Sequence, residues 1–535
     1  EEQSHRLGFD VREVGDIVYG LTSPHASDRC TVFMEQDINK LLRDGYSREE
    51  ALAAVIYSIA KNYINRVVGS RPITGNRVSF MGATARNRGL VAAFENLLDR
   101  EIVVSPYCHV MGAFGAALLS TQHEEAAYIK RFAGLDVFKG EIRLEYDVCS
   151  KCTNNCRITK AVFGDGRVES WGFLCGKESI DEKRRGKSRS YFPAMKRLIH
   201  DTVSGEPNGV ILNTGNLKKV GIPLVLSMHN YLPLWRTFFN HLGVEVILSK
   251  ESDGETKEKA VRISKTDFCF PMKIGLAHGD ELSRSEDVEA IFFPSFISEE
   301  NQANGLPRVF CPYVISYPSV AKAVGIGKPY IIPTIDFRQD EKFNLRELHE
   351  SLKPYGFSLN DIRHAYRSAL QAHKDFLRKR YEKGQEVLSA MREEGKTGIV
   401  FIGRPYNLYD GIINLKIPDR FQFYDYVIFP HELLIDPDDC TEVYHMYWNY
   451  GEVILKNAEL VRSIDNLYPV YLTNFSCGPD SFILSRFEKI MAGKPYLIIE
   501  LDEHGSETGY MTRIEAFNDI VMEKRRPAPD AADTS

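Results

Sequence analysis

The spacing of apolar positions near the start of the chain is that of a helix. In residues 47–69, SREEALAAVIYSIAKNYINRVVG, apolar side chains recur every three or four positions. Ser47 and Glu50 stand in capping-box spacing, in which each side chain binds the backbone N–H of the other residue. We therefore expect a helix that begins after Ser47. Its buried face should carry Leu52, Val55, Ile56, Ile59 and Tyr63.

The next segments alternate short apolar runs with helical patterns. Residues 77–98, RVSFMGATARNRGLVAAFENLL, predict a strand, a glycine turn at Gly82 and a helix. Residues 101–120, EIVVSPYCHVMGAFGAALLS, repeat this order and end in a helix of small residues that we expect to pack closely. Residues 1–125 thus form one helix-rich unit.

Beyond residue 205 the pattern becomes a regular alternation of strands and helices. Short apolar runs such as VEVILS, AIFFPSF and YIIPTID alternate with amphipathic stretches such as LPLWRTFFNHLG. The same order returns in TGIVFIGRP, YVIFP, YPVYLTNFSCG and KPYLIIELDEH. This predicts an α/β protein with two tandem open parallel-sheet domains, at residues 205–395 and 396–520. A long polar-faced helix at 358–396 connects them, and the tail 521–535 is expected to be disordered.

Composition and charge narrow the functional classes. The chain has 535 residues, of which 43% are hydrophobic and 26% charged, and its net charge is −6. These values are typical of globular proteins and give no reason to expect nucleic acid or an anionic membrane as partner. The longest apolar runs are too short to span a bilayer. The charged opening EEQSHRLGFD is unlike a signal peptide, so we expect a reducing cytoplasm. Its uncapped helical pattern predicts further native sequence upstream.

Four closely spaced cysteines predict a metal site. Residues 140–185 form a small strand-rich unit with a tight turn at Asp165-Gly166. Its cysteines follow C-x2-C-x3-C spacing with a fourth beyond the hairpin, which suits a four-thiolate shell. Structural zinc and an iron–sulfur cluster are both compatible with this spacing. Unpaired structural thiols are the alternative. The four residues are Cys149, Cys152, Cys156 and Cys175.

Three further cysteines share a different setting. Cys269, Cys311 and Cys477 each end a strand-like run beside a proline or glycine, in FCFPMK, FCPYV and FSCGPDS. Ligands of open α/β sheets gather at the carboxyl ends of the strands. We expect these thiols to converge between the two domains and to hold an iron–sulfur cluster with one iron left open. Three separate core cysteines are the alternative. The remaining cysteines are read as core or surface thiols: Cys30, Cys108 and Cys440.

A few charged residues near these thiols are candidates for substrate contacts. Lys273 and His278 follow Cys269 and could bind an anion or move a proton, although a structural lysine and a helix-face histidine remain the alternative. Arg404 and Tyr406 follow a strand and could clamp a phosphate or carboxylate. A third group consists of Asp502, Glu503 and His504. Its spacing could hold a metal, but we interpret its acidic residues as loop and cap groups.

These motifs resemble a known family. RCTVFMEQD, FMGATARNRGLVAAFE and SPYCHVMGAFGAALL are similar to the later half of the ATPase activators of 2-hydroxyacyl-CoA dehydratases, which belong to the actin-like and sugar-kinase superfamily. CFPMKIGLAHGD, CPYV, GRPYNLYD, NFSCGPDSF and LDEHGSETGYMTRIEAF resemble the dehydratase-related part of large bacterial activase–dehydratase fusion proteins, related also to benzoyl-CoA reductases. The resemblance runs from Glu1 to about Phe517.

The resemblance implies a fold, cofactors and partners. It implies half of an actin-like ATPase domain, flavodoxin-like sheet domains, and a 4Fe-4S or double-cubane cluster held by the three thiols of FCFPMK, FCPYV and FSCGPDS. It also implies an ATPase activator half or an electron donor of the ferredoxin or flavodoxin type, an acyl-CoA or other small-molecule substrate, and a homodimer. Gly82, Asn87 and Gly89 match the adenosine side of the nucleotide site.

The sequence also departs from the activators. Their cysteine-bearing glycine loop and phosphate-binding strands have no counterpart here, and Ala83 stands where a second glycine is usual. We therefore expect no ATP hydrolysis by this chain alone. The predicted function is that of an iron–sulfur component of an ATP-activated, low-potential reductase or dehydratase. A non-catalytic electron-transfer or assembly module, with zinc or iron–sulfur stabilisation, is the alternative.

Overall fold

The structure is a computed structural model, and it divides into two compact units. One comprises Glu1–Ile142 and Phe163–Asp165, and the other comprises Arg143–Val162 and Gly166–Ser535. The described residues are 2–26, 31–68, 73–122, 141–148, 157–164, 166–172, 188–201, 215–264, 266, 268–299, 307–324, 327–439, 446–505 and 507–525.

Helices dominate the first unit. The capping box predicted at Ser47 is confirmed, since Ser47 Oγ accepts from Glu50 N at 3.1 Å and Ser47 N donates to Glu50 Oε2 at 2.8 Å. Two short parallel strands pair beside the helices. The elements are α1 (Glu2–Leu7), α2 (Val14–Val18), α3 (Thr31–Arg43), α4 (Arg48–Tyr63), η1 (Ile64–Val68), β1 (Arg77–Ser79), η2 (Ala83–Arg86), α5 (Arg88–Leu98), β2 (Glu101–Val103), η3 (Cys108–Val110) and α6 (Met111–Gln122).

Two expectations about the packing of these helices are wrong. On α4, Ile59 and Tyr63 are about half exposed, and the buried face is made mainly of alanines together with Leu52 and Ile56. Alanine lets neighbouring helices approach closely. The face of α4 that packs is therefore the one that carries the alanines, and it is turned away from Ile59 and Tyr63. Helix α6 does not pack closely among the described residues, because its larger side chains are exposed: Phe114, Leu118 and Leu119.

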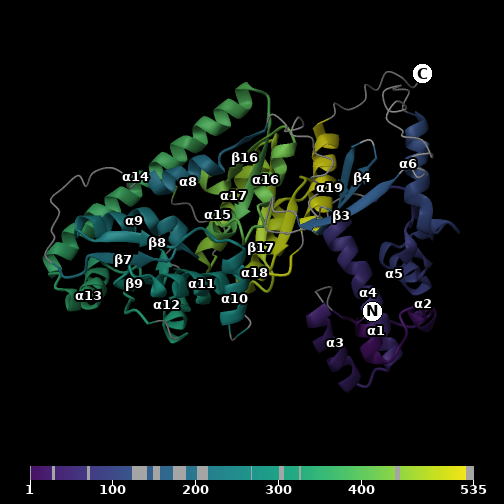
Figure 1. Cartoon of the computed structure of the whole chain (residues 1–535), viewed down its shortest axis with the longest axis horizontal. Coiled ribbons are helices and arrows are strands. Elements are labelled where there is room, and N and C mark those ends of the chain that lie inside the picture. The colour runs from purple at the N-terminus through teal and green to yellow at the C-terminus, as the bar shows by residue number, and fades with distance from the viewer. Residues whose placement is uncertain are drawn as a thin grey trace. The chain divides into compact units, whose positions relative to one another are not determined.

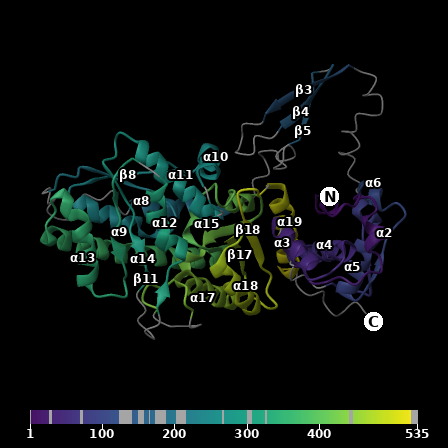
Figure 2. The same cartoon turned by 90° about the horizontal axis from the view of Figure 1, so that it is seen from below.

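A small antiparallel sheet occupies the region of the predicted cysteine-rich hairpin. Strands β3 (Ile142–Val148), β4 (Arg157–Phe163) and β5 (Val168–Trp171) lie in the order β3-β4-β5 (Figure 2). Gly166 has a φ of +82°, which suits the turn expected between β4 and β5. The cysteines predicted to bind metal here all lie outside the described residues: Cys149, Cys152, Cys156 and Cys175.

The second unit contains two all-parallel sheets, as the alternating pattern predicted (Figure 1). The first has the order β13-β9-β7-β8. The two short pairs β10–β14 and β11–β12 are separate from this sheet. Its strands and their neighbours are β7 (Lys219–Ile222), β8 (Glu245–Leu248), β9 (Ala290–Phe292), β10 (Ser295–Phe296), β11 (Ser298–Glu299), β12 (Arg308–Val309), β13 (Tyr330–Ile331) and β14 (Thr334–Ile335).

The second sheet has five strands in the order β18-β17-β15-β16-β6. Its central strand β15 is buried along its whole length, which is why TGIVFIG reads as a continuous apolar run. The edge strand β6 is a finding that the sequence did not predict, because SRS ends the charged stretch KESIDEKRRGKSRS, which shows no apolar alternation. The strands are β6 (Arg189–Ser190), β15 (Thr397–Gly403), β16 (Tyr426–Pro430), β17 (Leu467–Asn474) and β18 (Leu497–Leu501).

Helices cover both sheets and join them through one continuous apolar core. The longest, α14 (Leu359–Glu393), begins at a second capping box on Ser358 and packs on α9 and η8. The remaining helices are α8 (Phe192–Asp201), α9 (Met228–His241), α10 (Gly254–Ile263), α11 (Phe270–Arg284), α12 (Pro312–Ala323), α13 (Glu341–Leu352), η6 (Lys353–Tyr355), α15 (Pro405–Tyr409), α16 (Ile417–Arg420), η7 (Phe421–Phe423), η8 (His431–Leu434), α17 (Asn449–Ser463), α18 (Gly478–Ile490) and α19 (Glu507–Arg525).

Among the helices of the described ranges, none combines the length and the apolar character that crossing a bilayer would demand.

The contact between α14 and η8 generates a stability prediction. A Cβ added at Gly384 would overlap the carbonyl oxygen of Leu433, which is backbone and cannot rotate away. Gly384→Ala should therefore lower the free energy of unfolding by about 1–3 kcal/mol, despite the better helix propensity of alanine. Gly254→Ala, at an open position on α10, is the control and should change stability by less than about 1 kcal/mol. Urea unfolding checks both, and equal stability of the two variants would contradict the close approach.

Candidate functional site

Three helices of the second unit begin at cysteines. Cys269, Cys311 and Cys477 are the N-cap residues of α11, α12 and α18, and each helix has a proline in its first two positions. The free N–H groups and the helix dipole at such a position favour a thiolate. The expectation that each thiol ends a parallel strand holds only in part. Cys477 follows β17. The described residues before Cys269 form helix α10 and coil, so no described strand leads into α11, and Pro271 accounts for the start of this helix.

Two buried residues on α15 link these thiols electrostatically. Arg404, the N-cap of α15, is 1% exposed, and Tyr406 is 4% exposed. Interactions with Arg404 lower the pKa of Cys269 and Cys477, and Arg404 interacts with Cys311 as well. Burial raises the pKa of Tyr406 well above its ordinary value, with smaller contributions from Arg404 and from all three thiols. The three cysteines therefore have the same pair of neighbours.

Burial controls the protonation of two of these thiols. It raises the pKa of Cys269 to about 12, against the opposing effects of the Met272 N–H, Arg404 and Lys273. Burial also raises the pKa of Cys477, against the lowering by Arg404. Both are therefore protonated thiols at neutral pH in the free protein. Metal binding at such residues releases the protons, since the thiolate is the ligand.

The arrangement of the thiols differs from a single-ion site. Within the described residues, no three His, Cys, Asp or Glu side chains lie close enough together to hold one metal ion. Thiolates around one zinc ion lie about 2.3 Å from the metal, which demands close convergence. A polynuclear cluster is wider and accepts ligands that lie further apart. Metal binding by Cys269, Cys311 and Cys477 stays a prediction.

The candidate substrate clamps are both paired with carboxylates of the protein. Arg404 Nη2 lies 2.5 Å from Asp480 Oδ1, and the Thr473 hydroxyl donates to the other oxygen of Asp480. Lys273 Nζ lies 2.6 Å from Glu503 Oε1, with both side chains largely buried. These cations therefore have internal counter-ions.

His278 lies in a buried chain of hydrogen bonds. Its Nδ1 lies 2.7 Å from Ser249 Oγ, and its Nε2 lies 2.8 Å from Ser252 Oγ, which donates to Asp410 Oδ2 at 2.5 Å. Since the Ser252 hydroxyl has a single proton and gives it to Asp410, Nε2 must be the donor to Ser252. Burial lowers the pKa of His278, with Asp410 opposing. The sequence did not predict these partners. Ser249 and Ser252 are common polar residues without a motif, and Asp410 ends the quoted motif GRPYNLYD without any signal of its role.

The residues that follow β18 have separate roles. Asp502 Oδ1 accepts from His504 N at 3.0 Å, which is a local turn contact. The His504 side chain is 83% exposed, whereas Glu503 points inward to Lys273. Asp480, which neutralises Arg404, lies within the quoted motif FSCGPDS, and its position three residues after Cys477 was the available signal.

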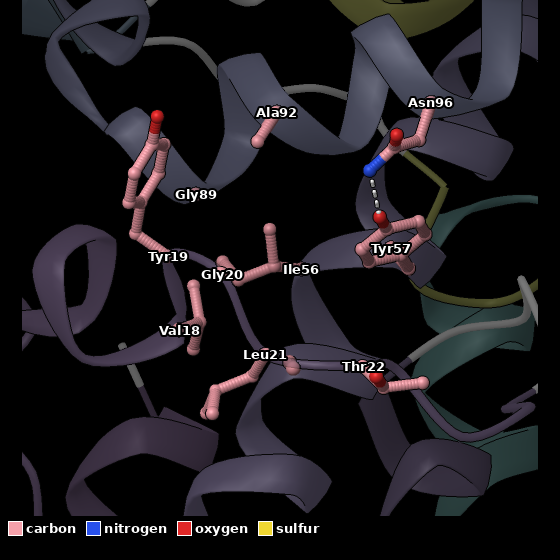
Figure 3. A pocket seen from close by; sticks show the side chains of 11 residues that line it. Val18, Tyr19, Gly20, Leu21, Thr22, Ile56, Tyr57, Gly89, Ala92 and Asn96 are labelled. Carbon is pink, nitrogen blue, oxygen red and sulfur yellow. Dashed lines mark hydrogen bonds between the residues drawn. The ribbon is translucent and has the colours of Figure 1, made fainter.

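The nucleotide-side candidates lie in the first unit. Gly82 has a φ of +103° and begins η2, while Asn87 Oδ1 accepts from Leu90 N at 2.9 Å and caps α5. A Cβ at Gly89 would overlap the Val18 side chain, so this glycine lets α2 approach α5. Gly89 also lines a cavity of about 310 Å³ (Figure 3). Tyr57 Oη lies 2.5 Å from Asn96 Nδ2 at one side of this cavity.

Two family models match segments of the chain. Residues 219–434 match the CoA enzyme activase uncharacterised domain, and residues 2–120 match the BadF/BadG/BcrA/BcrD ATPase family. Two separate segments of the chain are thus similar to domains of CoA enzyme activases and related ATPases. The resemblance inferred from the sequence motifs is therefore confirmed at the level of the family.

Individual relatives match about a fifth of this chain. A 2-hydroxyisocaproyl-CoA dehydratase activator of Clostridioides difficile is 33% identical over 113 residues, covering 21% of this chain and 42% of the relative. A protein of Methanocaldococcus jannaschii is 31% identical over 123 residues, covering 23% and 29%. The chain thus spans less than half the length of these relatives. The structure of the Clostridium difficile activator with bound ADPNP matches 24% of this chain and 48% of its own, at 27% identity and a TM-score of 0.21.

The Arg404–Asp480 pair generates the second prediction. Asp480→Asn leaves a guanidinium buried without its counter-ion, and should lower the free energy of unfolding by about 3–5 kcal/mol. Asp438→Asn removes the partner of Arg378 in an exposed ion pair and should cost less than about 1 kcal/mol. Urea denaturation of both variants measures the difference. Similar stabilities for the two variants would show that Arg404 does not depend on Asp480.

A buried histidine generates a prediction about pH. Burial lowers the pKa of His229 from 6.5 to about 3, so the unfolded chain binds this proton more readily than the folded one between these two values. The stability contribution is complete above pH 6.5 and is lost as the pH falls toward 3. Lowering the pH from about 7.5 to about 5 should cost about 2 kcal/mol through this residue. His229→Phe should lose that much less over the same interval in urea unfolding, and an unchanged pH dependence would contradict the assignment.

Proposed function

We propose that the chain is the iron–sulfur component of an ATP-activated, low-potential reductase or dehydratase of the 2-hydroxyacyl-CoA dehydratase type. The observation that carries the proposal is the common neighbourhood of three helix-capping thiols, Cys269, Cys311 and Cys477, around Arg404 and Tyr406. The family match supports an association with such enzyme systems. When bound, a cluster of this kind supplies low-potential one-electron transfer.

The donor set fits an iron–sulfur cluster. Three thiols leave one coordination position open, and their helix N-termini favour the deprotonated form that ligation requires. Arg404 provides a fixed positive charge beside them. Because Asp480 holds Arg404 in its turn, the guanidinium keeps this position without a substrate.

The ion pairs with buried carboxylates change the role proposed for Arg404 and Lys273. Arg404 stabilises thiolate charge, and Lys273 is a positioning residue that joins α11 to the chain after β18 through Glu503. His278 holds Ser252 and Asp410 in a fixed hydrogen-bonding order and is proposed as a proton-bearing group on α11.

The proposed partners follow from the names of the relatives. One is described as an activator of 2-hydroxyisocaproyl-CoA dehydratase. We propose that the N-terminal ATPase-family segment takes part in ATP-driven electron delivery together with the remaining portion of an activator. An electron donor of the ferredoxin or flavodoxin type would complete the pathway, and a reducing compartment such as the cytoplasm would keep the thiols reduced. The second group of cysteines, in the hairpin region, is proposed to hold zinc or a second cluster: Cys149, Cys152, Cys156 and Cys175.

One observation favours the alternative of a non-catalytic electron-transfer or assembly module. Both candidate substrate clamps, Arg404 and Lys273, are neutralised by buried carboxylates of the same chain. An electron-transfer module needs ligands and charge balance but no substrate anion site. Turnover of acyl-CoA by the iron-loaded protein together with its activator would separate the two functions.

Metal analysis tests the proposal. The full chain, purified and reconstituted without oxygen, should hold iron and acid-labile sulfide with cluster absorption. Cys311→Ser and Cys477→Ser should each remove the iron that this cluster holds, because a cluster with two protein thiolates is poorly held. Cys108→Ser is the matched control, since Cys108 is a buried cysteine of the first unit, and it should keep wild-type iron.

Two outcomes of the metal analysis would contradict the proposal. One is equal iron content in all three variants, and the other is iron without acid-labile sulfide in the wild type. Zinc measured in the same samples reports separately on the hairpin cysteines.

A further inference from the structure

The five-stranded parallel sheet ends at a long apolar edge. Its order β18-β17-β15-β16-β6 makes β18 and β6 the two outer strands. Strand β6 has two residues, whereas β18 has five, LIIEL, and among the described strands β18 pairs only with β17. A very short edge strand is itself protected against pairing with another chain, but an apolar edge of this length needs a different protection.

The pairing of β18 shows which of its backbone groups point outward. The Leu501 carbonyl oxygen accepts from Phe475 N at 2.9 Å, and Phe475 directly follows β17. Leu501 therefore turns its carbonyl toward β17. Along a parallel strand, successive residues turn their backbone groups to opposite sides of the strand. Ile498 and Glu500 consequently direct their carbonyl oxygens to the outer edge of the sheet.

Helix α19 provides hydrogen-bond donors to this outer edge. The helix follows β18 in the chain and contacts it (Figure 2). The Tyr510 hydroxyl donates to the Glu500 carbonyl oxygen at 3.0 Å, and Arg513 Nη2 donates to the Ile498 carbonyl oxygen. Both outward carbonyls are thus bonded to side chains rather than to another strand. Tyr510 and Arg513 lie in the motif LDEHGSETGYMTRIEAF, so these contacts give the motif a structural role.

A close contact with Gly505 holds the Tyr510 hydroxyl in place. A Cβ added at Gly505 would lie 2.5 Å from Tyr510 Oη and 3.1 Å from Leu415 Cδ1, so the Tyr510 ring would have to move. The rest of α19 is anchored independently, because Ile514 and Phe517 are buried in the apolar core. The two contacts with the strand edge can therefore be removed while the helix stays on the sheet.

The outer edge of β18 is suited to pairing with itself. In an antiparallel pair related by a twofold axis at Ile499, the backbone groups of Ile498 meet those of Glu500 from the second copy. Each Glu500 side chain then has an isoleucine opposite, so the pair brings no like charges together. The five-stranded sheets of the two copies would become continuous.

We propose that Tyr510 and Arg513 close the outer edge of β18 against strand pairing, and that the partner which the opened edge takes is the same edge of a second copy. The two side chains occupy the carbonyl oxygens that an incoming strand has to bind. Without them, the carbonyls of Ile498 and Glu500 become available on an apolar strand, which favours association. The closure acts on the sheet itself and does not depend on whether iron is bound.

Sedimentation velocity of the full chain over a wide concentration range tests the proposal. Tyr510→Phe combined with Arg513→Met removes both donors and keeps side chains of similar size, so this double variant should self-associate about tenfold more tightly than wild type. Gly505→Ala moves the Tyr510 ring off the Glu500 carbonyl and should act in the same direction by a smaller factor. Gly509→Ala, whose added methyl group has no described atom within 4 Å, is the control and should sediment as wild type.

A proline substitution tests whether the association uses this edge. Glu500→Pro removes an outward N–H and is compatible with an edge strand, because the bonds to β17 come from the residues on either side. Added to the double variant, it should return self-association to the wild-type level. The proposal fails if the double variant sediments as wild type, or if Glu500→Pro leaves its association unchanged. If the double variant does not fold, Gly505→Ala with and without Glu500→Pro gives the deciding comparison.

Discussion

The buried ion pair between Arg404 and Asp480 is the interaction on which the rest of the thiol region depends. It joins the end of β15 to the first turn of α18, two segments 76 residues apart. Two buried charges are tolerated in a protein interior only when each satisfies the other. The pair therefore fixes the start of α15 relative to the start of α18. Cys477 lies at that helix start, so the geometry around the thiol follows from an electrostatic requirement.

Much of the architecture could be predicted from local patterns. The capping boxes at Ser47 and Ser358 depend on residues three positions apart, and the parallel strands on continuous apolar runs. The spacing of apolar residues predicted the wrong buried face on α4, where alanines are buried and Ile59 is exposed. It also missed β6, because the pairing of Ser190 with Ile428 supplies the reason for a strand that its own residues do not indicate.

The candidate site was harder to predict because its contacts also join residues that lie far apart in the sequence. Its cysteines were identifiable from their proline and glycine neighbours, since these residues begin helices locally. The partners of the charged groups were not, because Lys273 meets Glu503 across 230 residues. Carboxylates that neutralise a cation carry no local signature, so the sequence offered substrate clamps as candidates where the fold contains internal ion pairs, and the structural lysine that it also offered fits Lys273 better.

The edge strand β6 has a consequence for the order in which the protein is made. The Ser188 hydroxyl donates to the Gln422 carbonyl, 234 residues later in the chain, and β6 pairs with the strand that follows Gln422. At ribosomal speeds of about 5–20 residues per second, this edge waits on the order of ten to fifty seconds for its partner. During that interval the charged stretch before it keeps an unpaired strand in water rather than in an aggregate. The polar composition that concealed β6 in the sequence thus protects the nascent chain.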